Sequence, residues 1–346
     1  MNKFINQIKN KGYTIIPNVL GRNETKRLKK LVEKYYDIDS KRKKPNFLKH
    51  KNKDKTVYNL QNKDYFFIKI FSKKIIVDIA KYFLNDPYYQ FLPKEKPNYI
   101  LKYYNARSSI NKLDLHIDSY MPFKGDLTYM MQFVFMLEDS DISNGCSVVV
   151  NGSHKSGKFC NRNSKKIKNL IANAGDLIIW DSRLWHGARQ NKNNKTRWSL
   201  VATLTRWFIK QSMDITKSLP NSIYRKCTNQ QKLFLGYCSL PPYNEFIGVN
   251  TKADYSKKCV ADFFKDMLSS SKEIYKLSTE MFKILLIMKD SPELFPQPKG
   301  KNANKKVEDA LTTAGVLMIA QKKHPIEIRD ALNAYLPPKL RTKDEE

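Results

Sequence analysis

Apolar residues at the start of the chain recur at intervals of three and four, the spacing that gives a helix one buried face. This pattern predicts helices over residues 24–36 and 75–83, the first with Asn23 as its N-cap. A short strand is expected within residues 13–20, which are rich in β-branched residues. Residues 38–56 are too charged and too irregular to assign.

The pattern changes from residue 99 to residue 208, where apolar segments become short, rich in β-branched and aromatic residues, and separated by turn signals. Such a pattern is typical of a β-sandwich or barrel. Five of the twelve glycines lie between residues 145 and 187, where close turns need them. The predicted strands are 99–105, 113–119, 128–137, 146–150, 176–180 and 196–207.

Helical spacing returns after Pro220. It predicts helices over residues 257–288, 307–322 and 325–336, and prolines interrupt the pattern between the first two. This part contains no internal repeat and no motif with recognisable chemistry.

With 346 residues, the chain is long enough for one catalytic domain and an appended module. The changes of pattern place the domain at residues 1–215, with its β core at about 97–210. Residues 216–346 are expected to form a helical extension of unknown role.

Cysteine usage favours a reducing compartment, and hydropathy argues against secretion and against a membrane span. The five cysteines are odd in number, widely scattered and never in a Cys-x-x-Cys pair, which argues against a disulfide framework and a zinc site. The first residues lack the apolar core of a signal peptide, and the longest apolar run, residues 284–288, is far too short to span a bilayer. We therefore expect a soluble, cytoplasmic protein with no membrane partner.

The formal net charge of +30 at pH 7 raises the question of a nucleic-acid partner. The positive charge comes from 51 lysines and only 12 arginines, whereas proteins that read phosphates and bases rely on the bidentate arginine side chain. Abundant asparagine and isoleucine beside lysine fit an A/T-rich coding sequence. We therefore interpret the lysines as a solvated surface.

Candidate chemistry is concentrated between His116 and Arg197, a region that holds three of the five histidines. His116 and Asp118 are two residues apart, so on a strand their side chains project from one face. His186 comes shortly after a later apolar strand. Two imidazoles and one carboxylate form the facial triad that holds non-haem Fe(II) and leaves coordination positions open for a co-substrate and oxygen. These three residues are therefore the predicted iron ligands.

Arg197 follows His186 across a polar segment that resembles a hairpin loop with its turn near Asn191. This spacing predicts that Arg197 and His186 are cross-strand neighbours, with the planar guanidinium close to the metal and able to clamp a carboxylate. Ser199, two residues further along the strand, is expected to face the same interior and donate to the same carboxylate.

Several motifs in this region occur in a fixed order: His116-x-Asp118, Asn144-Gly145, Asn151-Gly152-Ser153-His154, Ala174-Gly175-Asp176-Leu177, His186-Gly187 and Arg197. In order and spacing they resemble the phytanoyl-CoA dioxygenase family of Fe(II)- and 2-oxoglutarate-dependent oxygenases. The opening, Gly12-Tyr13-Thr14-Ile15-Ile16 followed by a helix, is also similar to the start of that family. The resemblance covers roughly residues 1–210.

The resemblance implies a mainly β core, a double-stranded β-helix or jelly-roll of the cupin type, flanked by N-terminal helices. It implies Fe(II) held by His116, Asp118 and His186. It also implies 2-oxoglutarate as co-substrate beside O2, with its distal carboxylate on Arg197. By the same resemblance, His154 belongs to a structural turn and is not a metal ligand.

One position departs from the family pattern. The family usually has a hydroxyl residue two positions after the distal histidine, where this chain has Ala188. The second donor to the 2-oxoglutarate carboxylate is therefore open among Ser199, Tyr103 and Tyr104, with plain barrel packing as the other interpretation of the tyrosines. We take Ser199 and Tyr104 as candidate cofactor-binding residues beside Arg197.

The resemblance implies a dioxygenase that hydroxylates an unactivated C–H bond and releases succinate and CO2. Because one fold and metal site serve many substrates, the resemblance leaves the substrate open among small molecules and carrier- or CoA-linked groups. The basic residues would suit an anionic substrate. The alternative is a nucleic-acid-directed oxygenase, or a basic nucleic-acid-binding protein, on the same fold.

Overall fold

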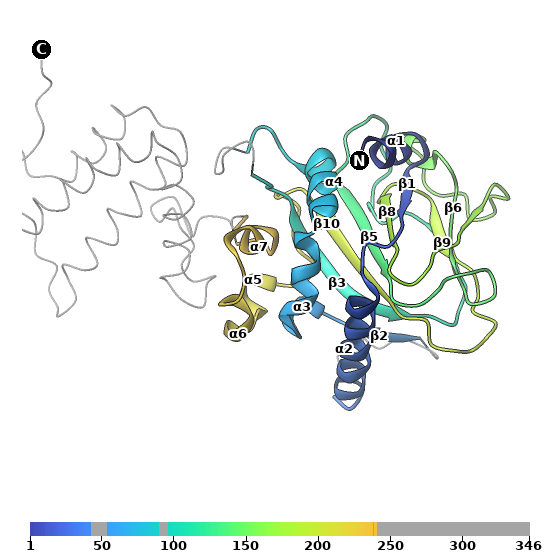
Figure 1. Ribbon diagram of the computed structural model, residues 1–346. Helices are drawn as coiled ribbons and strands as arrows, with labels where there is room; N and C mark the ends of the chain where they lie inside the picture. Colours follow the sequence, from blue (N-terminus) through green and yellow to red (C-terminus); the bar gives the residue numbers. More distant parts are fainter. Residues whose placement is uncertain (43–53, 90–95, 238, 241–346) are drawn as a thin grey trace, which may run out of the picture. The chain divides into compact units, whose positions relative to one another are not determined.

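The computed structural model describes residues 1–42, 54–89, 96–237 and 239–240 (Figure 1). The chain separates into two compact units, and the first comprises Met1–Asp86 and Pro97–Ser239. The helices predicted after residue 250 lie outside the described residues. Within the described part of the chain, no helix has the length and hydropathy needed to cross a membrane.

Two antiparallel sheets form the centre of the first unit. The larger sheet has the order β1-β8-β5-β10-β3-β2, and its strands are β1 Tyr13–Ile16, β2 Lys55–Val57, β3 Ile100–Ser108, β5 Met130–Met136, β8 Leu177–Asp181 and β10 Ser199–Thr205. The smaller sheet has the order β4-β9-β6-β7, with strands β4 Leu113–His116, β6 Ser147–Val149, β7 Lys168–Leu170 and β9 His186–Ala188.

The eight strands β3 to β10 follow the path of a jelly-roll. Between successive strands the chain passes from one sheet to the other, except that β6 and β7 are neighbours in the smaller sheet. Each sheet of this barrel therefore mixes early and late strands, as in a double-stranded β-helix. The predicted fold class is confirmed.

The core between the two sheets comes from the alternation of side chains along the strands. Val134 on β5 and Ile178 and Trp180 on β8 point inward from the larger sheet, and they pack with Val149 and Leu170 of the smaller one. All five side chains are buried. Residues two apart on a strand share a face, which is why these positions reach the interior together.

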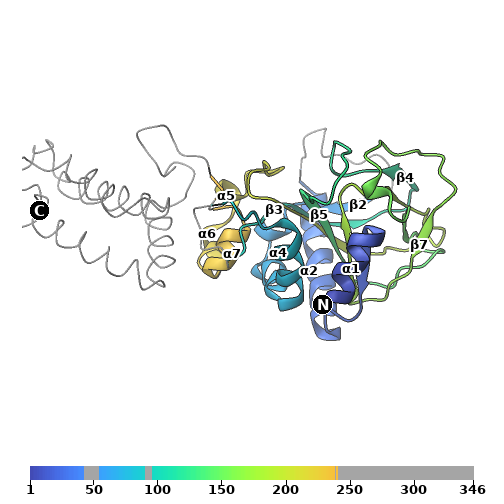
Figure 2. The same ribbon diagram turned by 90° about the horizontal axis from the view of Figure 1, so that it is seen from above.

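Helices cover the outer face of the larger sheet, on the side opposite the smaller sheet (Figure 2). The helices are α1 Asn2–Lys11, α2 Arg22–Ser40, α3 Tyr65–Lys69, α4 Lys74–Leu84, α5 Ile215–Ser218, α6 Asn221–Tyr224 and α7 Asn229–Phe234. Within the part of the chain that the structure describes, the 3-10 turns are η2 Leu60–Asn62, η3 Ile70–Ser72 and, after β6, η4 Ser153–Lys155. Phe71 in η3 contacts Phe135 of the sheet and Phe234 of α7, so segments from both ends of the unit share this layer.

The helices predicted at 24–36 and 75–83 are present as α2 and α4, with α2 longer at both ends. The N-cap of α2 is Gly21, not Asn23, because the Glu24 carboxylate accepts from the Gly21 N–H at 2.9 Å and starts the helix earlier. Helix α1 was not predicted. The compact unit also continues beyond residue 215, because α5 to α7 belong to it.

Candidate metal centre

His116 and His186 lie opposite each other on neighbouring strands of the smaller sheet. His116 ends β4, His186 begins β9, and the two residues are register partners in the antiparallel pair. Their imidazole centroids are 4.2 Å apart. Sheet pairing thus brings together two residues that are far apart in the sequence.

Asp118 completes the group from just beyond the end of β4. Its backbone N–H donates to the carbonyl of Ser182 at 2.8 Å, which fixes the chain where it leaves the strand. The carboxylate lies 3.6 Å from Nε2 of His116 and 3.2 Å from Nε2 of His186. The potential ligand atoms of the three residues all lie within 4.8 Å of one another.

Hydrogen bonds to the backbone orient both imidazoles. Nδ1 of His116 lies 2.9 Å from the carbonyl of Asp114, and Nδ1 of His186 lies 2.9 Å from the carbonyl of Leu184. When Nδ1 carries the proton and donates to these carbonyls, each Nε2 presents a lone pair toward Asp118. Two imidazole nitrogens and a carboxylate arranged in this way fit a divalent transition metal.

The charge state of Asp118 suits a metal ligand. Burial raises the pKa of this carboxyl, but attraction to His186 and hydrogen bonds from both histidines outweigh burial and hold its pKa well below the usual range. For His116, burial is the largest single effect and lowers the pKa, but the hydrogen bonds to Asp118 and to the Asp114 carbonyl and the attraction to Asp118 together raise the pKa by more. In the metal-free protein Asp118 is therefore ionised, and a proton competes with a metal for the His116 imidazole.

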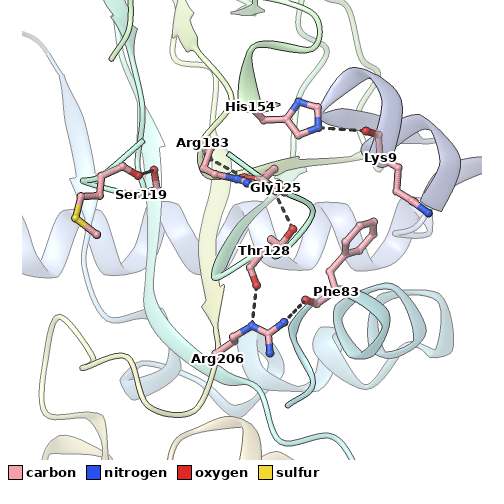
Figure 3. Close-up of polar contacts among 10 residues, drawn as sticks. Lys9, Phe83, Ser119, Gly125, Thr128, His154, Arg183 and Arg206 are labelled. Carbon is pink, nitrogen blue, oxygen red and sulfur yellow. Dashed lines mark hydrogen bonds and ion pairs between the residues drawn. The ribbon is translucent and has the colours of Figure 1, made fainter. Parts of the chain in front are cut away.

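Two buried arginines hold the loop that follows Asp118. Arg183 forms a two-point ion pair with Asp181 and donates to the carbonyl of Gly125 at 2.8 Å. Arg206 donates to the carbonyl of Thr128 at 2.8 Å, and the Thr128 hydroxyl donates to Asp181 (Figure 3). The loop between Asp118 and β5 is thus tied to the strands on which the site is built.

The two histidine strands approach closely at Gly187. A Cβ atom there would lie 2.4 Å from the backbone oxygen of Leu113 and 3.2 Å from backbone atoms of Asp114. Because these are backbone atoms, a side chain fits only if β4 and β9 move apart.

Replacing Gly187 with alanine is therefore expected to lower the free energy of unfolding by about 1–3 kcal/mol, the usual cost of inserting an atom into a packed region. It should also weaken metal binding, because His116 and His186 move with their strands. Denaturant unfolding and metal titration measure the two effects. Gly21→Ala is the control, since its nearest non-neighbouring atom would be 3.7 Å away. Alanine at this N-cap can lower stability but should leave metal affinity unchanged, so equal losses of metal affinity in the two variants would contradict the prediction.

Arg197 does not lie beside His186 on a paired strand. Arg197 lies two residues before β10, which belongs to the larger sheet, whereas His186 is on β9 of the smaller sheet and pairs with β4 and β6, so the predicted cross-strand pairing is wrong. The segment between them crosses from one sheet to the other and does not form a hairpin. The backbone N–H of Arg197 donates to Ser108, Nη1 donates to Ser140 at 2.9 Å, and the buried Nε has no hydrogen-bond partner within the described residues.

The two other predicted cofactor residues have different positions. Ser199 begins β10, and its hydroxyl lies 3.5 Å from the carbonyl of Arg107. Tyr104 is fully buried against Phe67 and Phe71, on the helix-covered face of β3. The expectation that Tyr104 contacts the co-substrate is corrected, because neighbouring residues on a strand point to opposite faces.

A cavity of about 320 Å³ opens beside Asp118. Much of its lining comes from the larger sheet, with Tyr103, Asn105 and Arg107 on β3, Gln132 on β5 and Thr203 on β10. Sequence reasoning named Tyr103 as an open alternative and missed the others. The available signal was the alternation along β3, which places residues 103, 105 and 107 on one face.

His154 lies apart from these ligands, as expected for a turn residue. It lies in η4, the turn that begins directly after Gly152, whose φ is 74°. Nε2 of His154 lies 3.2 Å from the carbonyl of Lys9 in α1 (Figure 3). Its role in the described structure is to connect this turn to the N-terminal helix.

The fold and this group of residues define a jelly-roll protein with a two-histidine, one-carboxylate centre. Residues 8–199, more than half of the chain, match the family model described as phytanoyl-CoA dioxygenase (PhyH). The chain belongs to the phytanoyl-CoA dioxygenase family.

Individual relatives are distant. Uncharacterized protein Rv1501 of Mycobacterium tuberculosis and uncharacterized protein Mb1539 of Mycobacterium bovis are each 27% identical over 114 residues, which is 32% of this chain and 41% of the relative. The matched part thus spans less than half the length of these curated relatives.

Two solved structures are similar in fold. HygX from Streptomyces hygroscopicus, with nickel and 2-oxoglutarate bound, is 14% identical with a TM-score of 0.49, covering 61% of this chain and 89% of HygX. The α-ketoglutarate-dependent epimerase SnoN from nogalamycin biosynthesis is 16% identical with a TM-score of 0.44, covering 60% of this chain and 83% of SnoN.

Proposed function

We propose that this protein is an Fe(II)- and 2-oxoglutarate-dependent oxygenase that hydroxylates a C–H bond of a small molecule. The observation that carries the proposal is the convergence of His116, Asp118 and His186, whose potential ligand atoms lie within 4.8 Å of one another inside a jelly-roll. Membership of the phytanoyl-CoA dioxygenase family supports the same reaction type.

In this proposal His116, Asp118 and His186 hold the iron. Bound iron would supply the redox chemistry that couples decarboxylation of 2-oxoglutarate to succinate and CO2 with hydroxylation of a C–H bond, one oxygen atom of O2 entering succinate and the other the substrate. The three protein ligands leave the remaining coordination positions for the co-substrate and oxygen. The backbone carbonyls of Asp114 and Leu184 keep both imidazoles in the orientation that this role requires.

Arg197 is the proposed anchor for the distal carboxylate of 2-oxoglutarate. Its Nε is buried and has no hydrogen-bond partner within the described residues, and burial lowers the pKa of the guanidinium. A buried cation with an unsatisfied donor strongly favours binding of a carboxylate. The carboxylate accepts the hydrogen bond and so removes the cost of leaving that donor without a partner. Ser140, which already accepts from Nη1, would hold the guanidinium in place.

A small-molecule substrate is supported by the cavity beside Asp118. Its volume of about 320 Å³ lies at the lower end of the range for small-molecule sites, roughly 300–1,000 Å³. The cavity borders Asp118, so a molecule bound in it would lie next to the proposed iron ligands.

The test is conversion of 2-oxoglutarate to succinate by the purified full chain with Fe(II) under air. We expect slow formation of succinate without added substrate, its loss on chelation with 2,2′-bipyridine, and recovery with Fe(II) but not with Zn(II), which is redox-inactive. Binding of 2-oxoglutarate to the Mn(II)-loaded protein by calorimetry supplies a second readout. If neither succinate formation nor metal-dependent 2-oxoglutarate binding is found, the proposed function is wrong.

A further inference from the structure

Gln132 lines the cavity and has an unsatisfied side-chain amide nitrogen. It lies on β5 and is fully buried. Its side-chain oxygen accepts from the hydroxyls of Thr203 at 2.7 Å and Tyr103 at 3.4 Å. These two bonds turn the oxygen toward the strands, and the buried amide nitrogen has no hydrogen-bond partner within the described residues.

Arg107 lines the same cavity from β3. Its Nε is buried and also has no hydrogen-bond partner among the described residues. An unsatisfied buried donor costs about 1–3 kcal/mol, and more when the group is charged, so proteins rarely keep one without a use. Two such donors, one cationic and one neutral, line one cavity beside Asp118.

The other charges that line the cavity leave Arg107 without a competing acid. Among the described residues the only acidic one in the lining is Asp118, which already faces the two histidines. Lys102 donates to the carbonyl of Lys210 at 2.9 Å, and burial lowers its pKa. Apart from the proposed metal ligand, the cavity is therefore cationic and rich in donors.

We infer that Arg107 forms an oxyanion subsite in this cavity, and that the substrate carries a carboxylate or phosphate group bound there. Gln132 lies further along the sheet, opposite Thr203 rather than Ser199 of β10, and is a second donor for another polar group of the substrate. The inference rests on the proposed function and adds the substrate class. Arginine suits this role because its planar fork matches both carboxylate and phosphate oxygens. Arg197, the proposed anchor for 2-oxoglutarate, is not part of this lining, so the two anions have separate cationic residues.

This subsite would determine which part of the substrate reaches the metal. An anion held on the larger sheet and the iron held on the smaller sheet form two fixed points across the cavity. Reaction is then limited to C–H bonds at a suitable distance from the anionic group. Such positioning by a remote charged group is a general means of orienting a substrate.

The experiment uses the full chain loaded with Mn(II) and saturated with 2-oxoglutarate. Paramagnetic broadening of probe signals by NMR reports binding near the metal. The probes are benzoate, phenyl phosphate and benzamide, of which benzamide resembles benzoate in shape but has no charge. We expect broadening for at least one of the two anions and none for benzamide at equal concentration, and the responding anion identifies the oxyanion class.

Arg107→Gln should reduce the affinity for the responding anion at least about tenfold, as expected for loss of a charge-assisted hydrogen bond. It should leave the dissociation constant of 2-oxoglutarate within about threefold of the native value. Arg22→Gln, at an exposed position outside the cavity, is the matched control. Circular dichroism checks folding, and if Arg107→Gln does not fold, Arg107→Lys, which keeps the charge but loses the fork, replaces it.

Three results would overturn the inference. Equal broadening by benzoate and benzamide, or no broadening by either anion, would remove the preference for an anion. Unchanged anion affinity in the Arg107 variant would remove the residue from the subsite. A loss of 2-oxoglutarate affinity in that variant as large as in an Arg197 variant would assign Arg107 to the co-substrate instead. Failure of the proposed function is distinguishable, because the native chain would then not bind 2-oxoglutarate in a metal-dependent way.

Discussion

Replacing Asp118 with alanine is expected to reduce succinate formation by at least about a thousandfold and to abolish stoichiometric iron binding. Losing a residue that only supports a metal ligand costs about 10–100-fold, so losing the carboxylate ligand itself should cost more. Among the described residues, the Asp118 carboxylate is also the one acidic group that contacts both imidazoles. Iron content by metal analysis and succinate formation at saturating 2-oxoglutarate measure the two effects.

Asp114→Ala is the matched control for this substitution. Asp114 lies on the same strand as His116, but its side chain is 63% exposed and pairs with Lys112. Its backbone carbonyl, which orients His116, is kept in the variant. We expect near-native iron content and turnover, and an Asp118 variant that behaves like this control would remove Asp118 from the metal centre.

Replacing Arg197 with methionine is expected to raise the 2-oxoglutarate concentration for half-maximal turnover at least about 30-fold. Two hydrogen bonds from a guanidinium to a carboxylate contribute about 2 kcal/mol or more, because each charge-assisted bond is stronger than a neutral one. Methionine fills much of the same space, so the core between the sheets should stay packed. Calorimetric titration of 2-oxoglutarate into the Mn(II)-loaded protein gives the same comparison without turnover.

Two controls separate the role of Arg197 from general damage. Arg189→Met removes an arginine of the same crossing segment, whose Nε donates to Asn169 on the smaller sheet. Ser199→Ala removes a hydroxyl whose contact is 3.5 Å long, and it should change 2-oxoglutarate affinity less than about fivefold. Equal affinities for 2-oxoglutarate in the native, Arg197 and Arg189 proteins would show that the distal carboxylate binds elsewhere.

The sequence was most informative where spacing along the chain determines the geometry. His116 and Asp118 are only two residues apart, so their proximity needs no knowledge of the sheets. The elements around them were also predictable, because alternation in the β segments and three-and-four spacing in α2 and α4 are local signals. The prediction that His186 joins the pair relied on the triad pattern, and the antiparallel pairing of β4 with β9 brings it there.

The wrong predictions concerned how strands pair and which face of the sheet a side chain takes. The hairpin between His186 and Arg197 required both strands to be in one sheet, but a jelly-roll moves successive strands between sheets. Tyr104 was placed on the wrong face, because a shift of one residue reverses the direction of every side chain on a strand. Arg107 and Gln132 were missed because they line one cavity only when β3 and β5 both pair with β10.

The first residues of the chain supply no proposed ligand, yet they support the site. Strand β1 pairs with β8, the carbonyl of Gly12 accepts from the N–H of Asp181, and His154 reaches the carbonyl of Lys9 in α1. Asp181 in turn pairs with Arg183, which holds the loop after Asp118. A deletion or a bulky fusion at this end would therefore disturb the metal centre from a distance. In an activity assay, the loss of activity would resemble that caused by a mutation of a metal ligand.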